Sequence, residues 1–261
     1  MKISIFSFAV NDKFPIDIMQ RQFAKYIKED FDFILFNDAN NSKMEENINT
    51  ITSYNKINCV RVPQNIHSVN TINNPSEAYA STLNWAVHDY AVKNNCEIIV
   101  LLHTDVFPVC EISVLDIIGN KSVASVTEFR LMNGKGVNYF YPALTIINMK
   151  RLNDANELDF GLSPGLDTGG NTKNFIENNP NSVKFMANHQ TSYFIATLNN
   201  NEPIGEYLKT DLAICRAHGL SAGWIADGFY HHMAGSQWNA SNPTFAEGHR
   251  QRMDLFLKYF Y

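Results

Sequence analysis

The segment Glu97–Leu102, which reads Glu-Ile-Ile-Val-Leu-Leu, constrains the fold more than any other part of the chain. A strand with apolar residues at successive positions must be buried on both faces, which is typical of the centre of a parallel sheet. Strand-like and helix-like segments alternate before it, as in βαβ units. We therefore predict a doubly wound α/β domain with a mostly parallel central sheet. In such domains ligands bind near the carboxyl ends of the strands.

The first half of the chain supplies the alternating elements. Apolar runs predict strands at Lys2–Ala9, Phe31–Phe36 and Asn58–Val62. Apolar residues spaced three and four apart predict a helix over Pro15–Ile27, and a longer helix is expected over Pro75–Val92, each with proline at its start.

The pattern changes beyond about Asp116. No repeat or low-complexity linker, apart from clusters of asparagine, separates this part from the first. We therefore predict one domain over residues 1–261 with an elaborated C-terminal half. The expected elements of that half are strands over Val123–Phe129, Tyr141–Ile147 and Ala222–Met233, and helices over Asn171–Glu177 and within Glu202–His218.

Charge and cysteine usage exclude several classes of protein. Lys and Arg number 21 against 26 Asp and Glu, so the chain lacks the basic excess typical of nucleic-acid binding. The apolar run Ile3–Val10 is too short for a signal peptide or for the roughly 20 residues of a membrane span, so no transmembrane segment is expected. Scattered cysteines without a CxxC pair exclude a disulfide scaffold and predict reduced thiols in a cytoplasmic protein: Cys59, Cys96, Cys110 and Cys215.

The central buried strand runs directly into His103-Thr104-Asp105. Residues two apart on a strand point to the same side, so His103 and Asp105 are expected to face one crevice. A carboxylate there can hold a divalent cation, and the cation can bind a diphosphate. The alternative is an Asp105 that caps the next turn beside a His103 that only packs, and the spacing leaves both interpretations open.

Four segments, taken in order, resemble the nucleotide-binding half of GT-A glycosyltransferases, which transfer a sugar from a nucleotide-sugar donor. The family pattern is a first strand, a second strand ending in an aspartate near the base, a helix with small residues and an asparagine, and an Asp-x-Asp motif that ends an apolar strand. In this chain His103 stands at the first Asp position and Asp105 at the second, which in the family usually reaches the metal. The matching segments are Lys2–Phe8, Phe31–Asp38, Pro75–Asn84 and Ile98–Pro108.

The resemblance implies a Rossmann-type sandwich in which residues 1–110 bind the donor, a UDP- or GDP-sugar, and residues 111–261 bind a glycan or other hydroxyl acceptor. It implies Mn²⁺ or Mg²⁺ as cofactor, and it implies that Asp38 hydrogen-bonds the base or the ribose of the donor. Taken alone, Asp38 equally suits an Asx-turn, and Asn84 equally suits an exposed helical position. The donor-site residues implied by the resemblance are Phe8, Asp38, Asn84, His103 and Asp105.

Two adjacent histidines end an expected strand within Phe229–Ser236. Several GT-A enzymes bring a late histidine back to the metal, and the resemblance implies this role for one of the pair. Adjacent strand residues face opposite ways, so at most one of them points into the cleft. We prefer His231 to His232 as the ligand, and a structural pair is the alternative.

The turn Ser163–Gly170 is glycine-rich but lacks the GxGxxG spacing, so a dinucleotide-binding loop is not expected. Its Asp167 is the candidate catalytic base, because inverting GT-A enzymes need a carboxylate that accepts the proton of the acceptor hydroxyl. The alternative is a turn or N-cap carboxylate.

Further candidates concern the acceptor. Aromatic side chains that can pack on sugar rings cluster at Tyr139–Tyr141, Trp224 and Trp238, although most are expected in the core. Glu128 and Arg130 could hydrogen-bond an acceptor. The alternative is that they belong to an ordinary solvent-exposed face of the strand.

The sequence thus predicts a metal-dependent glycosyltransferase, and two other interpretations stay open. A sugar nucleotidyltransferase normally carries an early glycine-rich, basic segment, whereas Ser4–Lys13 has no glycine. A GT-A-like module that binds a nucleotide or glycan without turnover is suggested by the missing first Asp.

Overall fold

The computed structural model describes residues 1–10, 16–66, 75–132, 134–197, 203–232 and 243–261 of the chain. The chain forms two compact units. Unit 1 comprises residues 1–11, 28–103 and 113–186, and unit 2 comprises residues 12–27, 104–112 and 187–261. The division of a single domain into residues 1–110 and 111–261 stays a prediction.

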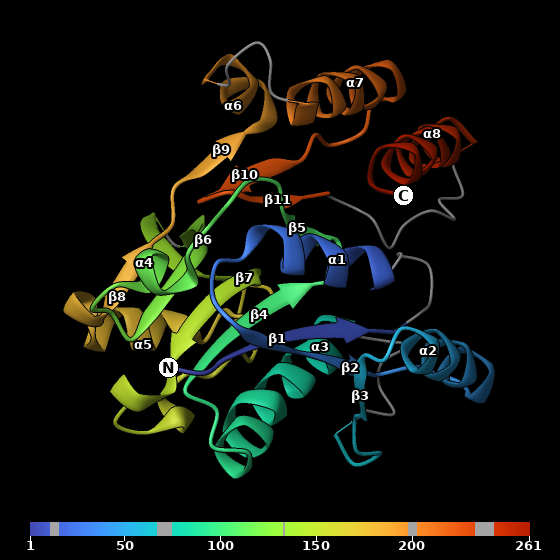
Figure 1. Cartoon of the computed structure of the whole chain (residues 1–261). Coiled ribbons are helices and arrows are strands. Elements are labelled where there is room, and N and C mark those ends of the chain that lie inside the picture. Colours follow the sequence, from blue (N-terminus) through green and yellow to red (C-terminus); the bar gives the residue numbers. More distant parts are fainter. Residues whose placement is uncertain (11–15, 67–74, 133, 198–202, 233–242) are drawn as a thin grey trace. The chain divides into compact units, whose positions relative to one another are not determined.

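A seven-stranded sheet organises unit 1, in the order β3-β2-β1-β4-β7-β6-β8. β1 pairs in parallel with β2 and β4, and β2 with β3, while β7 is antiparallel to β4 and β6. This mostly parallel sheet, with α3 beneath it in Figure 1, confirms the predicted α/β class. Its strands are β1 (Ile3–Ala9), β2 (Phe31–Asn37), β3 (Asn58–Arg61), β4 (Ile98–His103), β6 (Val123–Met132), β7 (Lys135–Asn148) and β8 (Val183–Phe185).

Successive strands are added on one side of β1 and then on its other side. The chain goes from β1 outward through β2 to β3 and then returns to place β4 on the other side of β1. Such a switch point opens a crevice at the carboxyl ends of the strands, where α/β sheets bind ligands. Phe8 lies there with Phe36 as its neighbour on one side and His103 on the other.

The main core of unit 1 lies between the sheet and the helical layer formed by α3 (Pro75–Trp85), η2 (Ala86–Ala91) and α5 (Thr172–Asn178). Leu83, Val87 and Phe175 pack there against alternate strand residues such as Phe6 and Leu101. The helix predicted over Pro75–Val92 is confirmed, with π-helical geometry in η2. The remaining helices described in unit 1 are α2 (Ser42–Tyr54), α4 (Val114–Ile118), η3 (Met149–Arg151), η4 (Ala155–Glu157) and η5 (Pro180–Ser182).

Unit 2 contains a four-stranded sheet in the order β5-β11-β10-β9. The single strand predicted over Ala222–Met233 is wrong within the described residues, because two antiparallel strands occupy that region. Asp227 and Gly228 join them with φ of 45° and 87°, the left-handed backbone that a tight hairpin turn requires. Met233 lies outside the described residues. The strands are β5 (Val106–Pro108), β9 (Asn188–Gln190), β10 (Trp224–Ala226) and β11 (Phe229–His231).

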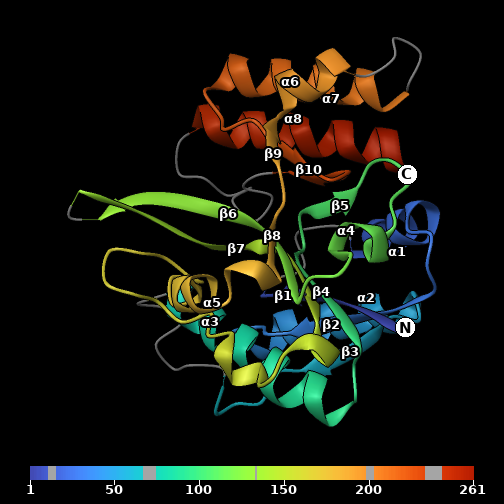
Figure 2. The ribbon, with the colours of Figure 1, turned by 90° about the vertical axis from the view of Figure 1, so that its left-hand side faces the viewer.

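Aromatic side chains fill the core of unit 2. Phe107 of β5 contacts Tyr230 of β11 and Phe256 of the last helix, with ring centroids 5.7 and 5.1 Å away. In Figure 2 the helices α7 and α8 run side by side above β10. None of the described helices combines the length and the apolar character needed to cross a bilayer. The helices are α1 (Ile16–Tyr26), α6 (Thr191–Thr197), α7 (Pro203–His218) and α8 (Pro243–Phe260).

Candidate functional site

The carboxyl ends of β1 and β2 place Phe8 and Asp38 at the switch point of unit 1. The Phe8 ring stacks on Phe36 at 5.2 Å and meets Tyr79 edge-on at 5.7 Å. Asp38 follows β2 and is 3% exposed. Its Oδ2 accepts a hydrogen bond from the Thr82 hydroxyl at 2.9 Å, which ties the turn after β2 to α3.

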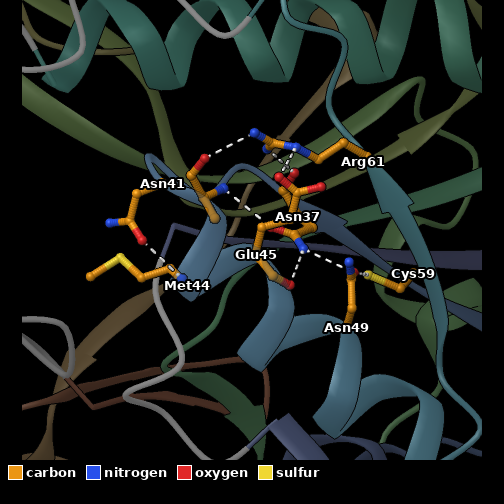
Figure 3. A network of polar contacts seen from close by, with 8 residues as sticks. Asn37, Asn41, Met44, Glu45, Asn49, Cys59 and Arg61 are labelled. Atoms are coloured by element: carbon orange, nitrogen blue, oxygen red, sulfur yellow. Dashed lines mark hydrogen bonds and ion pairs between the residues drawn. The ribbon is translucent and has the colours of Figure 1, made fainter.

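Arg61, which sequence analysis did not single out, organises the turn that carries Asp38 (Figure 3). Its guanidinium donates to the carbonyl of Asn37 at 2.7 Å and to that of Ala39 at 2.9 Å. Its Nε lies 3.3 Å from the carboxylate of Glu45. Arg61 therefore holds the backbone on both sides of Asp38 from the end of β3.

The same network fixes α2 beside this turn. The buried amide of Asn37 donates to the Glu45 carbonyl at 3.2 Å and to the Asn49 side chain at 3.0 Å. Asn41 caps the helix, because its side-chain oxygen accepts from the backbone N–H of Met44 at 2.9 Å.

We expect Arg61→Ala to lower the free energy of unfolding by about 1–3 kcal/mol, because two buried carbonyls lose a charged donor. Arg61→Lys should recover only part of the loss, since one ammonium does not replace the planar fork that spans both carbonyls. Urea denaturation of the three proteins measures this. Equal stability of the wild type and Arg61→Ala would show that the network does not hold the turn.

Asn84 is engaged on both of its polar atoms. Its Nδ2 donates to Asp159 at 2.8 Å and its Oδ1 accepts from the Phe160 backbone at 2.7 Å. Burial raises the pKa of Asp159, but hydrogen bonds from the Gly161 backbone and from Asn84 and Asn171 outweigh it and leave the pKa below its ordinary value. Asn84 thus joins α3 to the segment that leads to Asp167, and its predicted role toward a donor stays a prediction.

A pocket of about 240 Å³ brings predicted residues together within unit 1. His103, at the end of β4, meets the rings of Tyr79 at 5.1 Å and Tyr141 at 6.1 Å. The carboxylates of Glu128 and Asp167 also line this pocket. Its lining residues are Pro75, Ser76, Tyr79, His103, Glu128, Tyr141, Pro142, Asp167 and Thr168.

Asp167 is exposed and locally fixed. Its Oδ1 accepts a hydrogen bond from the backbone N–H of Thr168 at 2.8 Å. The Thr168 hydroxyl in turn donates to the Ser76 carbonyl at 2.9 Å, so the turn is attached to the start of α3. This hydrogen bond fits the alternative interpretation of Asp167 as a turn carboxylate. Its role as a catalytic base stays a prediction.

Asp105 and His231 form a buried pair within unit 2. β11 is antiparallel to β5, with His231 opposite Val106. The His231 Nε2 lies 3.3 Å from Asp105 Oδ1, and the two side chains are 3% and 10% exposed. Trp224 of the neighbouring strand meets the His231 ring edge-on at 4.8 Å.

His232 points to a different partner. Its Nε2 lies 3.5 Å from Asp211, whose carboxylate also receives Arg252 at 2.7 Å and the Tyr230 hydroxyl at 2.6 Å. Burial and the Arg252 charge lower the pKa of His232 below its ordinary value. The His232 backbone N–H donates to the Asp105 carbonyl at 2.8 Å, so this buried network is attached to the residue that precedes β5.

The remaining sequence-based candidates differ in whether the structure describes them and in how far their side chains are buried. Trp238 and residues 233–236 lie outside the described residues. Tyr139 is fully buried, and Arg130 is half exposed beside Glu128. The four cysteines are free thiols.

No family model and no curated protein matches this chain. The galactosyltransferase LgtC, solved in complex with donor and acceptor sugar analogs, is 11% identical over 99% of this chain and 96% of its own, with a TM-score of 0.49. The mannosyltransferase Ktr4p from S. cerevisiae is 10% identical over 57% of this chain and 56% of its own, with a TM-score of 0.37. The bifunctional glycosyltransferase WbbM is 13% identical over 98% of this chain and 51% of its own, with a TM-score of 0.47.

Proposed function

We propose that this chain is a Mn²⁺-dependent glycosyltransferase that uses a nucleotide-diphosphate sugar, either UDP- or GDP-linked, and a hydroxyl acceptor. The observation that carries the proposal is the buried Asp105–His231 pair of unit 2, 3.3 Å apart, whose Asp105 follows the end of the central strand β4 by two residues in the chain. A carboxylate beside an imidazole, at that place in the chain, suits a cation that faces a diphosphate.

His103 is the proposed third ligand. One residue separates it from Asp105, so the chain itself keeps their Cα atoms within about 7 Å. His103, Asp105 and His231 each offer one ligand atom. Carboxylates suit Mg²⁺ and Mn²⁺ alike, whereas imidazole suits the softer transition metals, so this mixed set favours Mn²⁺ over Mg²⁺. The bound ion would neutralise charge that develops on the leaving diphosphate.

The nucleoside is proposed to bind at the carboxyl ends of β1 and β2. Asp38 is held there by Thr82 and by the Arg61 network, so its carboxylate is oriented before a ligand arrives. Phe8 supplies an apolar surface beside it. This placement follows the rule that doubly wound sheets bind nucleotides at the switch point.

Asp167 is the proposed base for the acceptor. Its Oδ1 is fixed by the Thr168 N–H, and the carboxylate lines the pocket shared with His103. It would accept the proton of an acceptor hydroxyl that attacks the donor sugar.

The test is a screen of UDP- and GDP-sugars with and without Mn²⁺, measured by thermal shift and by release of nucleoside diphosphate. One donor should raise the melting temperature in Mn²⁺, because ligands that bind only the folded state stabilise it, and should be hydrolysed slowly without an acceptor. Binding of no nucleotide under any condition would refute the proposal. Binding without turnover would instead favour a non-catalytic module, and pyrophosphate release from a nucleoside triphosphate and a sugar phosphate would favour a nucleotidyltransferase.

A further inference from the structure

The pocket that contains His103 has a distinct chemical character. Two acidic residues, Glu128 and Asp167, line it together with Tyr79 and Tyr141, and the nine described lining residues include no lysine or arginine. Its volume of about 240 Å³ is below the roughly 300–1,000 Å³ of pockets for drug-sized ligands, which suits a single sugar ring. Aromatic rings beside carboxylates offer an apolar surface for C–H groups and acceptors for hydroxyl groups.

Tyr139 links the Glu128 carboxylate to the backbone of Asp167. It is fully buried and its hydroxyl donates to Glu128 Oε2. Burial and Glu128 raise the pKa of Tyr139 above its ordinary value, while the backbone of Asp167, in contact with the same hydroxyl, acts in the opposite direction. The Tyr139 hydroxyl therefore lies between the β6–β7 hairpin and the turn that carries Asp167, and it holds both in place.

Arg130 adds a second connection. Its guanidinium lies 3.4 Å from the Glu128 carboxylate and 3.4 Å from the Gly165 carbonyl, so it too links the hairpin to the turn. Its side chain is 43% exposed, where solvent screens its charge. Among the described residues that line the pocket, the acidic side chains are those of Glu128 and Asp167.

We propose that this pocket binds the acceptor as a neutral sugar, through hydroxyl groups that donate to Glu128 and Asp167, and that it excludes sugars bearing a carboxylate. This inference rests on the proposed function only in naming the bound sugar as the acceptor; the binding of a neutral sugar does not depend on it. Bringing a third carboxylate beside two others in a partly enclosed site is unfavourable by like-charge repulsion, whereas a hydroxymethyl group in the same position is accepted.

Two pairs of probes test this, since each pair differs only in CH₂OH against COO⁻ at C6: p-nitrophenyl β-glucoside with β-glucuronide, and the corresponding galactoside with galacturonide. Ligand-observed NMR titrations of the metal-free protein give the affinities, because Mn²⁺ on the proposed ligand His103, which lines the pocket, would attract a carboxylate. We expect the wild type to prefer one neutral probe over its acidic partner by at least about tenfold. In Glu128→Gln the preference should fall to about threefold or less, and Asp167→Asn should act in the same direction. Glu46→Gln, which removes one exposed charge from α2, is the matched control and should change nothing.

Three results would overturn the inference: an acidic probe bound as tightly as its neutral partner, no binding of any probe, or unchanged selectivity in both folded variants. The first would indicate that Arg130 rather than the carboxylates sets the preference. Mn²⁺-dependent release of nucleotide from a donor, measured on the same preparations, reports separately on the proposed function. Selective binding without such release would retain the pocket assignment and refute the transferase.

Discussion

Asp105→Asn is expected to lower Mn²⁺-dependent turnover of the donor by at least about 100-fold. The amide keeps the size of the side chain but removes the charge that attracts a divalent cation. His231 alone would then remain of the buried pair. The measurement is the initial rate of nucleotide release at several Mn²⁺ concentrations, and a shift of the half-saturating concentration should accompany the loss.

The matched control is Asp227→Asn in the turn between β10 and β11. It removes one carboxylate from the same hairpin that carries His231, but Asp227 is exposed and has φ of 45°, a conformation that asparagine adopts readily. Its rate should equal that of the wild type. A folded Asp105→Asn protein with wild-type rates would exclude Asp105 as the metal ligand.

Asp211→Asn should destabilise the chain by about 3–5 kcal/mol, because it leaves a buried guanidinium without its counter-charge. Asp211 and Arg252 have side chains 1% and 0% exposed and form two contacts, at 2.7 and 3.0 Å. Urea denaturation measures the change. Asp254→Asn, an exposed site on α8, is the control and should stay within about 0.5 kcal/mol of the wild type.

A double variant distinguishes a lost ion pair from general damage. Asp211→Asn/Arg252→Met removes both charges, and replacing a buried pair by apolar groups is often neutral, so it should be more stable than Asp211→Asn alone. An Asp211→Asn protein as stable as the wild type would show that the pair does not stabilise unit 2.

The Asp211 carboxylate also makes the stability of the fold depend on pH. Burial raises the pKa of Asp211, but the hydrogen bond and charge of His232 and the charge of Arg252 outweigh it, so the pKa lies below its ordinary value. A group with a lower pKa in the folded state stabilises above its unfolded pKa, about 4, and loses that effect as the pH falls through the folded value. The wild type should therefore lose more stability below about pH 4 than Asp211→Asn does.

Much of the fold follows from local patterns. The apolar runs that predict strands at Lys2–Ala9, Phe31–Phe36 and Glu97–Leu102 correspond to β1, β2 and β4, because a strand covered on both faces needs an uninterrupted apolar sequence. The hairpin of β10 and β11 was missed, although Asp-Gly between apolar segments is a strong turn signal. In contrast, α2 has only Ile48 and Thr52 buried, too few to show a helical stripe.

The site is less predictable because its geometry depends on contacts between distant segments. His103 and Asp105 are two residues apart, so the prediction that they act together needs only the local sequence. The pairing of Asp105 with His231 requires β5 to join β11, more than a hundred residues later, and no local signal specifies that register. The contacts of Arg61 and Tyr139 were not predicted for the same reason: their partners are backbone carbonyls and a carboxylate brought near by the sheet.

Direct measurement of Mn²⁺ binding by electron paramagnetic resonance tests the central claim without any substrate. We predict one Mn²⁺ site per chain in the wild type, weakened at least about tenfold in Asp105→Asn and in His231→Gln, and unchanged in Asp227→Asn. Wild-type binding in both ligand variants, or no binding by the wild-type protein with or without UDP and GDP, would contradict it.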